Sequence, residues 1–118
     1  MSPKPVIEEF LTRVLGPKSW GMEVLIAHTP QYLGKVLFMN KDHGGPLQYH
    51  ERKDETFYLL SGEALITYHD AKGDRQTRKM HPGMSMHVPP GAVHQVTALE
   101  DCVIFEASTP VFEDRVAV

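Results

Sequence analysis

Apolar residues follow two different periods along this chain of 118 residues. Over residues 3–15 the apolar side chains recur at the spacing of one helical face, at Val6, Ile7, Phe10, Leu11, Val14 and Leu15. Ser2 and Pro3 are suitable for a helix start, and Gly16 with Pro17 ends the pattern. We therefore predict an N-terminal helical arm, residues 1–16, whose apolar stripe packs on the rest of the protein or on a second subunit.

After Trp20 the pattern changes to short apolar runs separated by turn residues such as Pro89-Pro90-Gly91. The predicted strands are 22–28, 35–40, 56–60, 64–68, 85–88, 94–98 and 102–107. Many short strands without alternating helices indicate an all-β sandwich or barrel. We expect one domain of residues 1–118, with the barrel over residues 17–118.

Composition and charge narrow the class of protein. Hydrophobic residues make up 42% and charged residues 23% of the chain, which is typical of a folded globular protein. The net charge of −3 leaves no basic stripe for a nucleic acid, and no apolar stretch approaches the roughly 20 residues of a membrane span. A single cysteine, Cys102, and a start without the pattern of a signal peptide lead us to expect a cytoplasmic protein.

The candidate chemistry lies in two segments that carry metal-binding residue types. Gln48 and His50 are two positions apart, so an extended chain directs both side chains to one face. Glu55 opens the next strand, and His94 follows the Pro-Pro-Gly turn. Imidazole and carboxylate without thiolate suit Zn, Fe, Mn, Ni or Co, and two histidines with one carboxylate form a facial triad with open positions.

These two segments resemble the paired motifs of the cupin superfamily. The second motif matches at Gly83, Pro89, Gly91 and His94, with Ala98 in place of its final asparagine. The first matches at His50, Glu55 and Gly62, with Gln48 in place of its first histidine. The resemblance implies a jelly-roll barrel that binds one divalent metal ion through His50, Glu55 and His94, with Gln48 as an optional fourth ligand.

A narrower resemblance concerns the small cupins related to mannose-6-phosphate isomerase, including the cupin domain of mannose-1-phosphate guanylyltransferase/isomerase proteins. It rests on Lys18-Ser19-Trp20-Gly21, Glu23, Gly34-Lys35, Leu47-Gln48-Tyr49-His50 and Ser61-Gly62. The chain departs from that pattern at Ser19, which replaces proline, and at Arg52, which replaces a histidine. The resemblance implies isomerisation of a sugar or sugar phosphate.

An isomerase needs a group that moves a proton between adjacent carbons, in addition to a metal ion. Lys35 shares its strand face with Leu37 and Met39, so it either points into the barrel as this catalytic group or lies on an outer face. His87 is the second catalytic candidate, with packing beside the proline turn as the alternative. Arg52 and Lys53 are candidates to attract an anionic substrate, but as members of a charged loop they are expected to be solvated.

Two other functions remain open at this stage. The same triad suits an Fe(II)-dependent dioxygenase, with Phe38, Tyr49, Phe57 and Phe105 as candidates to line an apolar pocket. The third alternative is a non-catalytic cupin that binds a small molecule. In every case we expect a small-molecule ligand, no nucleic acid or membrane partner, and a homodimer formed by strand exchange or sheet packing.

Overall fold

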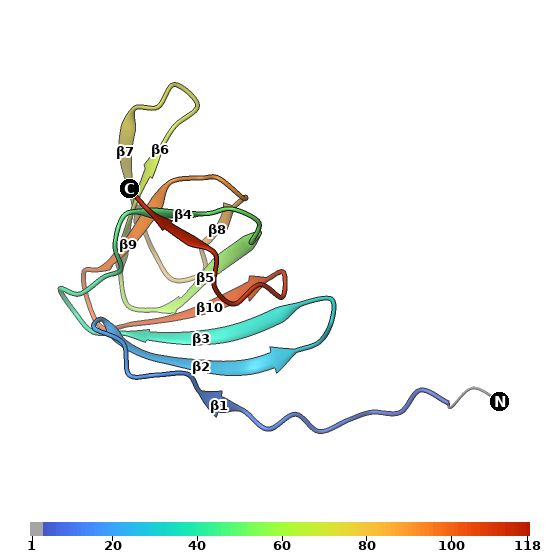
Figure 1. The fold of residues 1–118 in the computed structure, drawn as a ribbon. Coiled ribbons are helices and arrows are strands. Elements are labelled where there is room, and N and C mark those ends of the chain that lie inside the picture. Colours follow the sequence, from blue (N-terminus) through green and yellow to red (C-terminus); the bar gives the residue numbers. More distant parts are fainter. Residues whose placement is uncertain (1–3) are drawn as a thin grey trace.

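The computed structural model describes residues 4–118 as two antiparallel β-sheets, with no helix among these residues (Figure 1). The larger sheet has the order β1 (Arg13–Val14), β2 (Gly21–His28), β3 (Leu33–Met39), β10 (Cys102–Ser108), β5 (Glu55–Ser61) and β8 (Ser85–Val88). The smaller sheet has the order β11 (Arg115–Ala117), β4 (Gln48–His50), β9 (His94–Ala98), β6 (Ala64–His69) and β7 (Arg75–Met80). Since residues 4–118 contain no helix, none of them forms a helical membrane span.

The predicted N-terminal helix is wrong for the residues that the structure describes. Residues 4–12 have no regular structure, and Arg13–Val14 pair with Leu25 and Val24 at the edge of β2. An isolated helix of this length is marginal in water, and an open sheet edge offers the backbone hydrogen bonds that a short helix would otherwise make. The expected helix start at Ser2–Pro3 lies outside the described residues.

All seven predicted strands are present, and the structure adds four that the sequence did not predict. β7 was missed because Arg75–Lys79 is a run of exposed polar residues, without the alternation that marks a half-buried strand. It is held by a full antiparallel register with β6. β1, β4 and β11 have only two or three residues each, which is too short for a periodic pattern.

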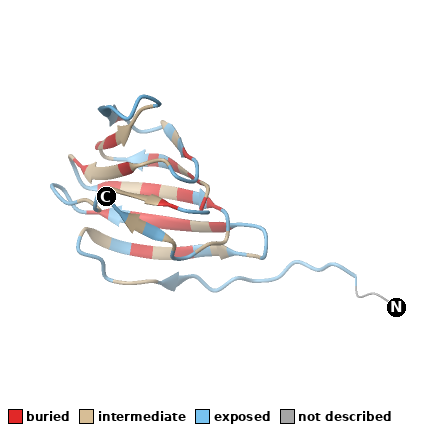
Figure 2. Cartoon of the chain, turned by 45° about the horizontal axis from the view of Figure 1, so that its top comes forward, coloured by how far each residue is buried: buried red, intermediate tan, exposed pale blue. Residues whose placement is uncertain are grey.

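The core lies between the two sheets. Along the strands of the larger sheet, buried positions alternate with half-buried and exposed ones, whereas residues 4–14 are all exposed (Figure 2). Residues from both sheets form one hydrophobic cluster, which includes Leu37, Phe57, Leu59, Ile66, Met80 and Ile104. This cluster fills part of the space between the sheets, and polar side chains line the rest.

Candidate metal centre

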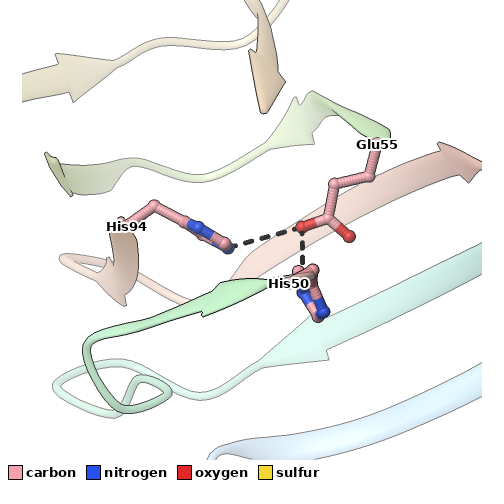
Figure 3. A group of neighbouring side chains, drawn as sticks. All are labelled: His50, Glu55 and His94. Atoms are coloured by element: carbon pink, nitrogen blue, oxygen red, sulfur yellow. Dashed lines mark ion pairs between the residues drawn. The ribbon is translucent and has the colours of Figure 1, made fainter. Parts of the chain in front are cut away.

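Three strands bring the predicted metal ligands together inside the barrel. His50 ends β4, Glu55 begins β5 and His94 begins β9, where it lies opposite Gln48 of β4. The Glu55 carboxylate lies between the two imidazoles (Figure 3). Its Oε1 is 3.5 Å from Nε2 of His50 and 3.4 Å from Nε2 of His94.

This geometry fits one first-row metal ion. One ligand atom from each of the three residues lies within 4.8 Å of the other two, and all three residues are buried. Ligand atoms about 2.0–2.2 Å from a common ion are themselves roughly 3–3.5 Å apart. Oε1 of Glu55 is buried without a hydrogen-bond partner, which is costly unless a cation compensates it, whereas Oε2 lies against the Lys53 ammonium.

Both imidazoles are held so that the same nitrogen faces the carboxylate. His50 Nδ1 is 2.9 Å from Oδ1 of Asp114, and His94 Nδ1 is 2.9 Å from the carbonyl oxygen of Ala92. Because these acceptors favour the tautomer with a proton on Nδ1, Nε2 of each ring is left to bind a metal. Hydrogen-bonded acceptors behind metal-binding histidines are the usual way in which such rings are oriented.

Asp114 is the functional residue that sequence reasoning missed. Its Oδ2 accepts hydrogen bonds from the backbone N–H groups of Arg52 (2.7 Å) and Lys53 (3.0 Å), so the carboxylate ties His50 to the loop that leads to Glu55. It is brought there by the pairing of β11 with β4. The local sequence cannot predict the contact between Asp114 and His50, because the two residues are 64 positions apart. The neighbouring strand β11 has only three residues, which is too short to show a hydrophobic period.

The charges around the site favour an ionised Glu55. Burial opposes its ionisation, but His50, His94 and the Lys53 ammonium outweigh burial and hold the pKa of the Glu55 carboxyl well below its ordinary value of 4.5. Burial likewise opposes a charged His50, yet Glu55 and Asp114 raise the pKa of its imidazole above 6.5. The centre therefore presents a carboxylate anion between the two imidazoles.

The expectation that Lys53 is solvated is wrong. Lys53 is only 3% exposed, and its Nζ lies 3.3 Å from Oε2 of Glu55 and 2.7 Å from Oε2 of Glu106. The two carboxylates outweigh the cost of burial and raise the pKa of the Lys53 ammonium. A buried lysine is stable only when it is paired with a negative charge. Here Lys53 holds Oε2 of Glu55, while Oε1 faces the two histidines.

The centre opens on a cavity of about 310 Å³ between the sheets. Besides the three ligands, its polar lining consists of Lys18, Glu23, Lys35, Gln48, Lys53, Gln95, Glu106, Glu113 and Arg115. Lys35 is buried here, with Nζ 2.5 Å from Oε1 of Glu23 and 5.6 Å from the ring centre of Phe112. The Lys35 side chain therefore points into the barrel and not to the outer face of the sheet.

His87 does not join this group. Its side chain is 60% exposed on β8, and its Nε2 lies 2.6 Å from Oδ1 of Asp54. It borders a second cavity of about 280 Å³, lined mainly by apolar residues of β6, β8 and the turn before β9. Within the described residues, Lys35 and Gln48 thus line the same cavity as the candidate metal ligands, and His87 lies outside it.

Comparisons with known proteins agree with this geometry. Residues 35–109 match the model of the cupin domain. A comparison with curated proteins finds no match. Among solved structures, KdgF from Halomonas sp. is similar with a TM-score of 0.75 and 21% identity, over 86% of this chain and 91% of that one.

Two larger proteins contain a similar fold. The capsular polysaccharide assembling protein CapF from Staphylococcus aureus gives a TM-score of 0.81 at 17% identity, and 93% of this chain covers 33% of it. Bacillus subtilis oxalate decarboxylase, described with Mn(II) centres, gives 0.72 at 18% identity, with 86% of this chain covering 29% of it. The chain thus spans about a third of each of these two proteins. With its family match over residues 35–109 and a cupin-like arrangement of strands, the chain belongs to the cupin domain family.

Proposed function

We propose that this cupin holds one divalent metal ion through His50, Glu55 and His94, with Gln48 as an optional fourth ligand. The buried Oε1 of Glu55, which has no hydrogen-bond partner, and the orientation of both histidine rings support this assignment. The ion would polarise a carbonyl or hydroxyl oxygen of a substrate. The Mn(II) centres of the structurally similar decarboxylase are a reason to test Mn(II) beside Zn(II) and Fe(II).

The reaction that we favour is proton transfer on a small polar molecule, as in the isomerisation of a sugar or sugar phosphate. One observation carries this proposal: the buried Lys35–Glu23 pair and the metal ligands line the same cavity. A lysine and a carboxylate in contact supply a proton donor and a proton acceptor within one site. Their role is to take a proton from one carbon of the bound molecule and return it to the neighbouring carbon.

The buried charges around the centre match a divalent ion. Lys35 and Lys53 contribute two positive charges, and Glu23, Glu55, Glu106 and Asp114 contribute four negative charges. A divalent ion would offset this difference in a buried space, where unscreened charge is costly. The other charged side chains of the cavity, Lys18, Glu113 and Arg115, are exposed to solvent.

The donor set itself favours a second candidate, an Fe(II)-dependent dioxygenase, because two histidines and one carboxylate are the ligands of that enzyme class. The aromatic residues give it less support. Of Phe38, Tyr49, Phe57 and Phe105, only Phe57 lines the cavity. Phe38 and Phe105 lie on the other face of their strands, where they alternate with buried residues.

Hydrogen exchange tests the favoured function. Protein loaded with Mn(II), Zn(II) or Fe(II) is incubated in heavy water with a panel of aldoses, ketoses and their phosphates, and deuterium in the C–H positions is followed by NMR. We expect incorporation that Lys35→Met lowers by about 100-fold or more. Lys41→Met, which changes an exposed lysine, is the matched control.

Two outcomes would overturn this proposal in favour of its alternatives. O₂ uptake by the Fe(II)-loaded protein with an aromatic panel, without deuterium incorporation, would identify a dioxygenase. Silence in both assays, together with a small molecule that stays bound in native mass spectrometry, would identify a binding protein.

A further inference from the structure

Lys53 and Glu106 form a buried ion pair directly behind a candidate metal ligand. The Lys53 Nζ lies 2.7 Å from Oε2 of Glu106, and both residues are buried. The same Nζ lies 3.3 Å from Oε2 of Glu55. A buried ion pair is costly to desolvate and contributes little net stability. Stability alone is therefore a weak reason for such a pair beside the metal centre.

The Glu55 carboxylate has its two oxygens in different surroundings. Oε1 lies 3.5 Å from Nε2 of His50 and 3.4 Å from Nε2 of His94. Oε2 lies against the Lys53 ammonium instead. An ion between the two imidazoles would therefore meet Oε1, because the attraction of Lys53 holds Oε2 away from it.

The Lys53 residue is held both at its backbone and at its ammonium. Its backbone N–H donates to Oδ2 of Asp114 at a distance of 3.0 Å. Its ammonium is anchored on Glu106 of β10, a strand that pairs with β3 on one side and with β5 on the other. The position of the ammonium relative to Glu55 is thus determined by Asp114 and by the interior of the larger sheet.

We propose that Lys53, anchored by Glu106, is a positioning residue that keeps Glu55 a one-oxygen ligand of the metal ion. A carboxylate can bind an ion through one oxygen or through both. With both oxygens bound, Glu55 would occupy a position on the ion that a substrate needs. This inference rests on the proposed function, since it concerns how the proposed ion is held.

The consequence concerns the class of substrate. An octahedral Mn(II) ion accepts about six ligand atoms. Two imidazoles, one oxygen of Glu55 and the optional Gln48 leave space on such an ion for a pair of atoms, and a second oxygen of Glu55 would remove this space. Since the centre opens on the cavity, a substrate can reach these positions. The site therefore fits a substrate that binds the ion through two neighbouring oxygens, such as a hydroxyl group beside a carbonyl group.

Water bound to Mn(II) measures the positions that the protein leaves free. The 118-residue chain is loaded with Mn(II), and the broadening of the EPR lines in ¹⁷O-enriched water counts the bound water molecules. We expect at least about two in the wild type, which is what an ion with about six positions retains. Lys53→Met/Glu106→Gln should bind one fewer, because the released Oε2 of Glu55 replaces a water molecule. This double substitution removes one charge of each sign, so the net charge of the centre is unchanged.

A chelating probe tests the substrate class. Acetohydroxamate binds a metal ion through two oxygens, whereas azide binds through one nitrogen. Titration of each probe is followed by the relaxation rate of the water protons, which falls as bound water is displaced from Mn(II). In Lys53→Met/Glu106→Gln the dissociation constant of acetohydroxamate should rise by about tenfold or more, the scale on which groups behind a metal ligand act. The constant for azide should change much less.

Lys79→Met/Glu63→Gln is the matched control. It makes the same exchanges in an exposed ion pair with an N–O distance of 3.2 Å. This variant should keep the water count and both dissociation constants of the wild type. A circular dichroism spectrum equal to that of the wild type shows that each variant is folded.

Several results would overturn the role of Lys53. A wild-type Mn(II) ion with fewer than about two bound water molecules would do so without any variant, so the test also decides where the substituted pair does not fold. A folded double variant that keeps the wild-type water count and acetohydroxamate affinity, or that no longer binds Mn(II), would do so as well. A wild type that binds no divalent ion would contradict the proposed function, and this inference with it.

Discussion

Asp114 shows how one side chain can determine the geometry of the whole centre. Its two oxygens hold His50 on one side and the backbone of residues 52–53 on the other. Burial opposes its ionisation, but these N–H groups outweigh it and keep the pKa of Asp114 below its ordinary value. The carboxylate therefore stays an acceptor on both sides at neutral pH, and it fixes the tautomer in which Nε2 of His50 faces Glu55.

Replacing this carboxylate should weaken metal binding. In Asp114→Asn, the amide can accept on one side only, so either His50 or the backbone N–H groups lose a partner. We expect a metal affinity lowered by about 10–100-fold, measured by competition with a chromogenic chelator. Asp101→Asn is the matched control, because Asp101 also accepts a backbone N–H, from Lys41, far from the site. Equal affinities in the two variants would contradict the role of Asp114.

The Glu23–Lys35 pair should make stability depend on pH. Burial works against ionisation of Glu23, but Lys35 and then Lys18 outweigh it and lower the pKa of its carboxyl below 4.5. A group with a depressed pKa in the folded state stabilises the fold above its unfolded pKa, and this contribution is lost as the pH falls through its folded pKa.

Glu23→Gln should accordingly lower the free energy of unfolding by about 3 kcal/mol at neutral pH, because it leaves Lys35 buried without its partner. The difference from the wild type should shrink as the pH falls below 4.5, and urea unfolding at several pH values measures it. Glu100→Gln, which breaks an exposed pair with Lys41, should change stability little at any pH. A constant difference for Glu23→Gln across this range would show that the ion pair is not its cause.

At the scale of elements, the turn between β5 and β6 requires a glycine at position 62. Gly62 has φ of +87°, and a Cβ there would lie 2.2 Å from the carbonyl oxygen of Asp101. Gly73, in the turn between β6 and β7, has nearly the same φ of +82° but no atom within 4 Å of such a Cβ. Substitutions at these two glycines therefore distinguish the cost of backbone strain, which both share, from the cost of steric overlap, which occurs only at Gly62.

Gly73→Ala should cost only the strain of a left-handed residue, about 1–2 kcal/mol. Gly62→Ala should cost at least about 2 kcal/mol more, because the backbone of Asp101 must also move. Thermal and urea unfolding of the two variants measure the difference. Similar losses of stability in both variants would show that the backbone at Asp101, just before β10, moves aside without a measurable loss of stability.

The strands that the sequence predicted each contain buried apolar residues. β10 alternates between the core and the outer face, and its apolar residues report this directly. β7 pairs with β6 along an exposed hairpin, so its sequence shows no alternation of apolar and polar residues. The helical spacing of residues 3–15 was misleading because these apolar side chains are exposed in the single chain, and spacing does not reveal what covers a segment.

The candidate site divides in the same way. The grouping of His50, Glu55 and His94 was predictable because these residues match positions of the two cupin motifs. Asp114 and Lys53 were not, because their roles depend on contacts between segments far apart in sequence and on burial in a loop of charged residues. Only the tertiary structure brings these two residues to the candidate site.

For the whole molecule, the two sides of the larger sheet differ in character. Its inner side combines apolar core residues with Glu23, Lys35, Glu55 and Glu106, which is a costly set of buried charges. Its outer side exposes Met22, Phe38 and Tyr58, although a sheet face that meets water is usually polar. We interpret the inner side as the environment of the proposed metal-dependent reaction.

The central claim is that His50, Glu55 and His94 hold one metal ion, and metal content measures it most directly. Native mass spectrometry with elemental analysis should find one divalent ion per wild-type chain and none in His50→Ala/His94→Ala. The control His43→Ala/His81→Ala, which removes two exposed histidines, should keep the full ion content. An unchanged metal stoichiometry in His50→Ala/His94→Ala would contradict the account.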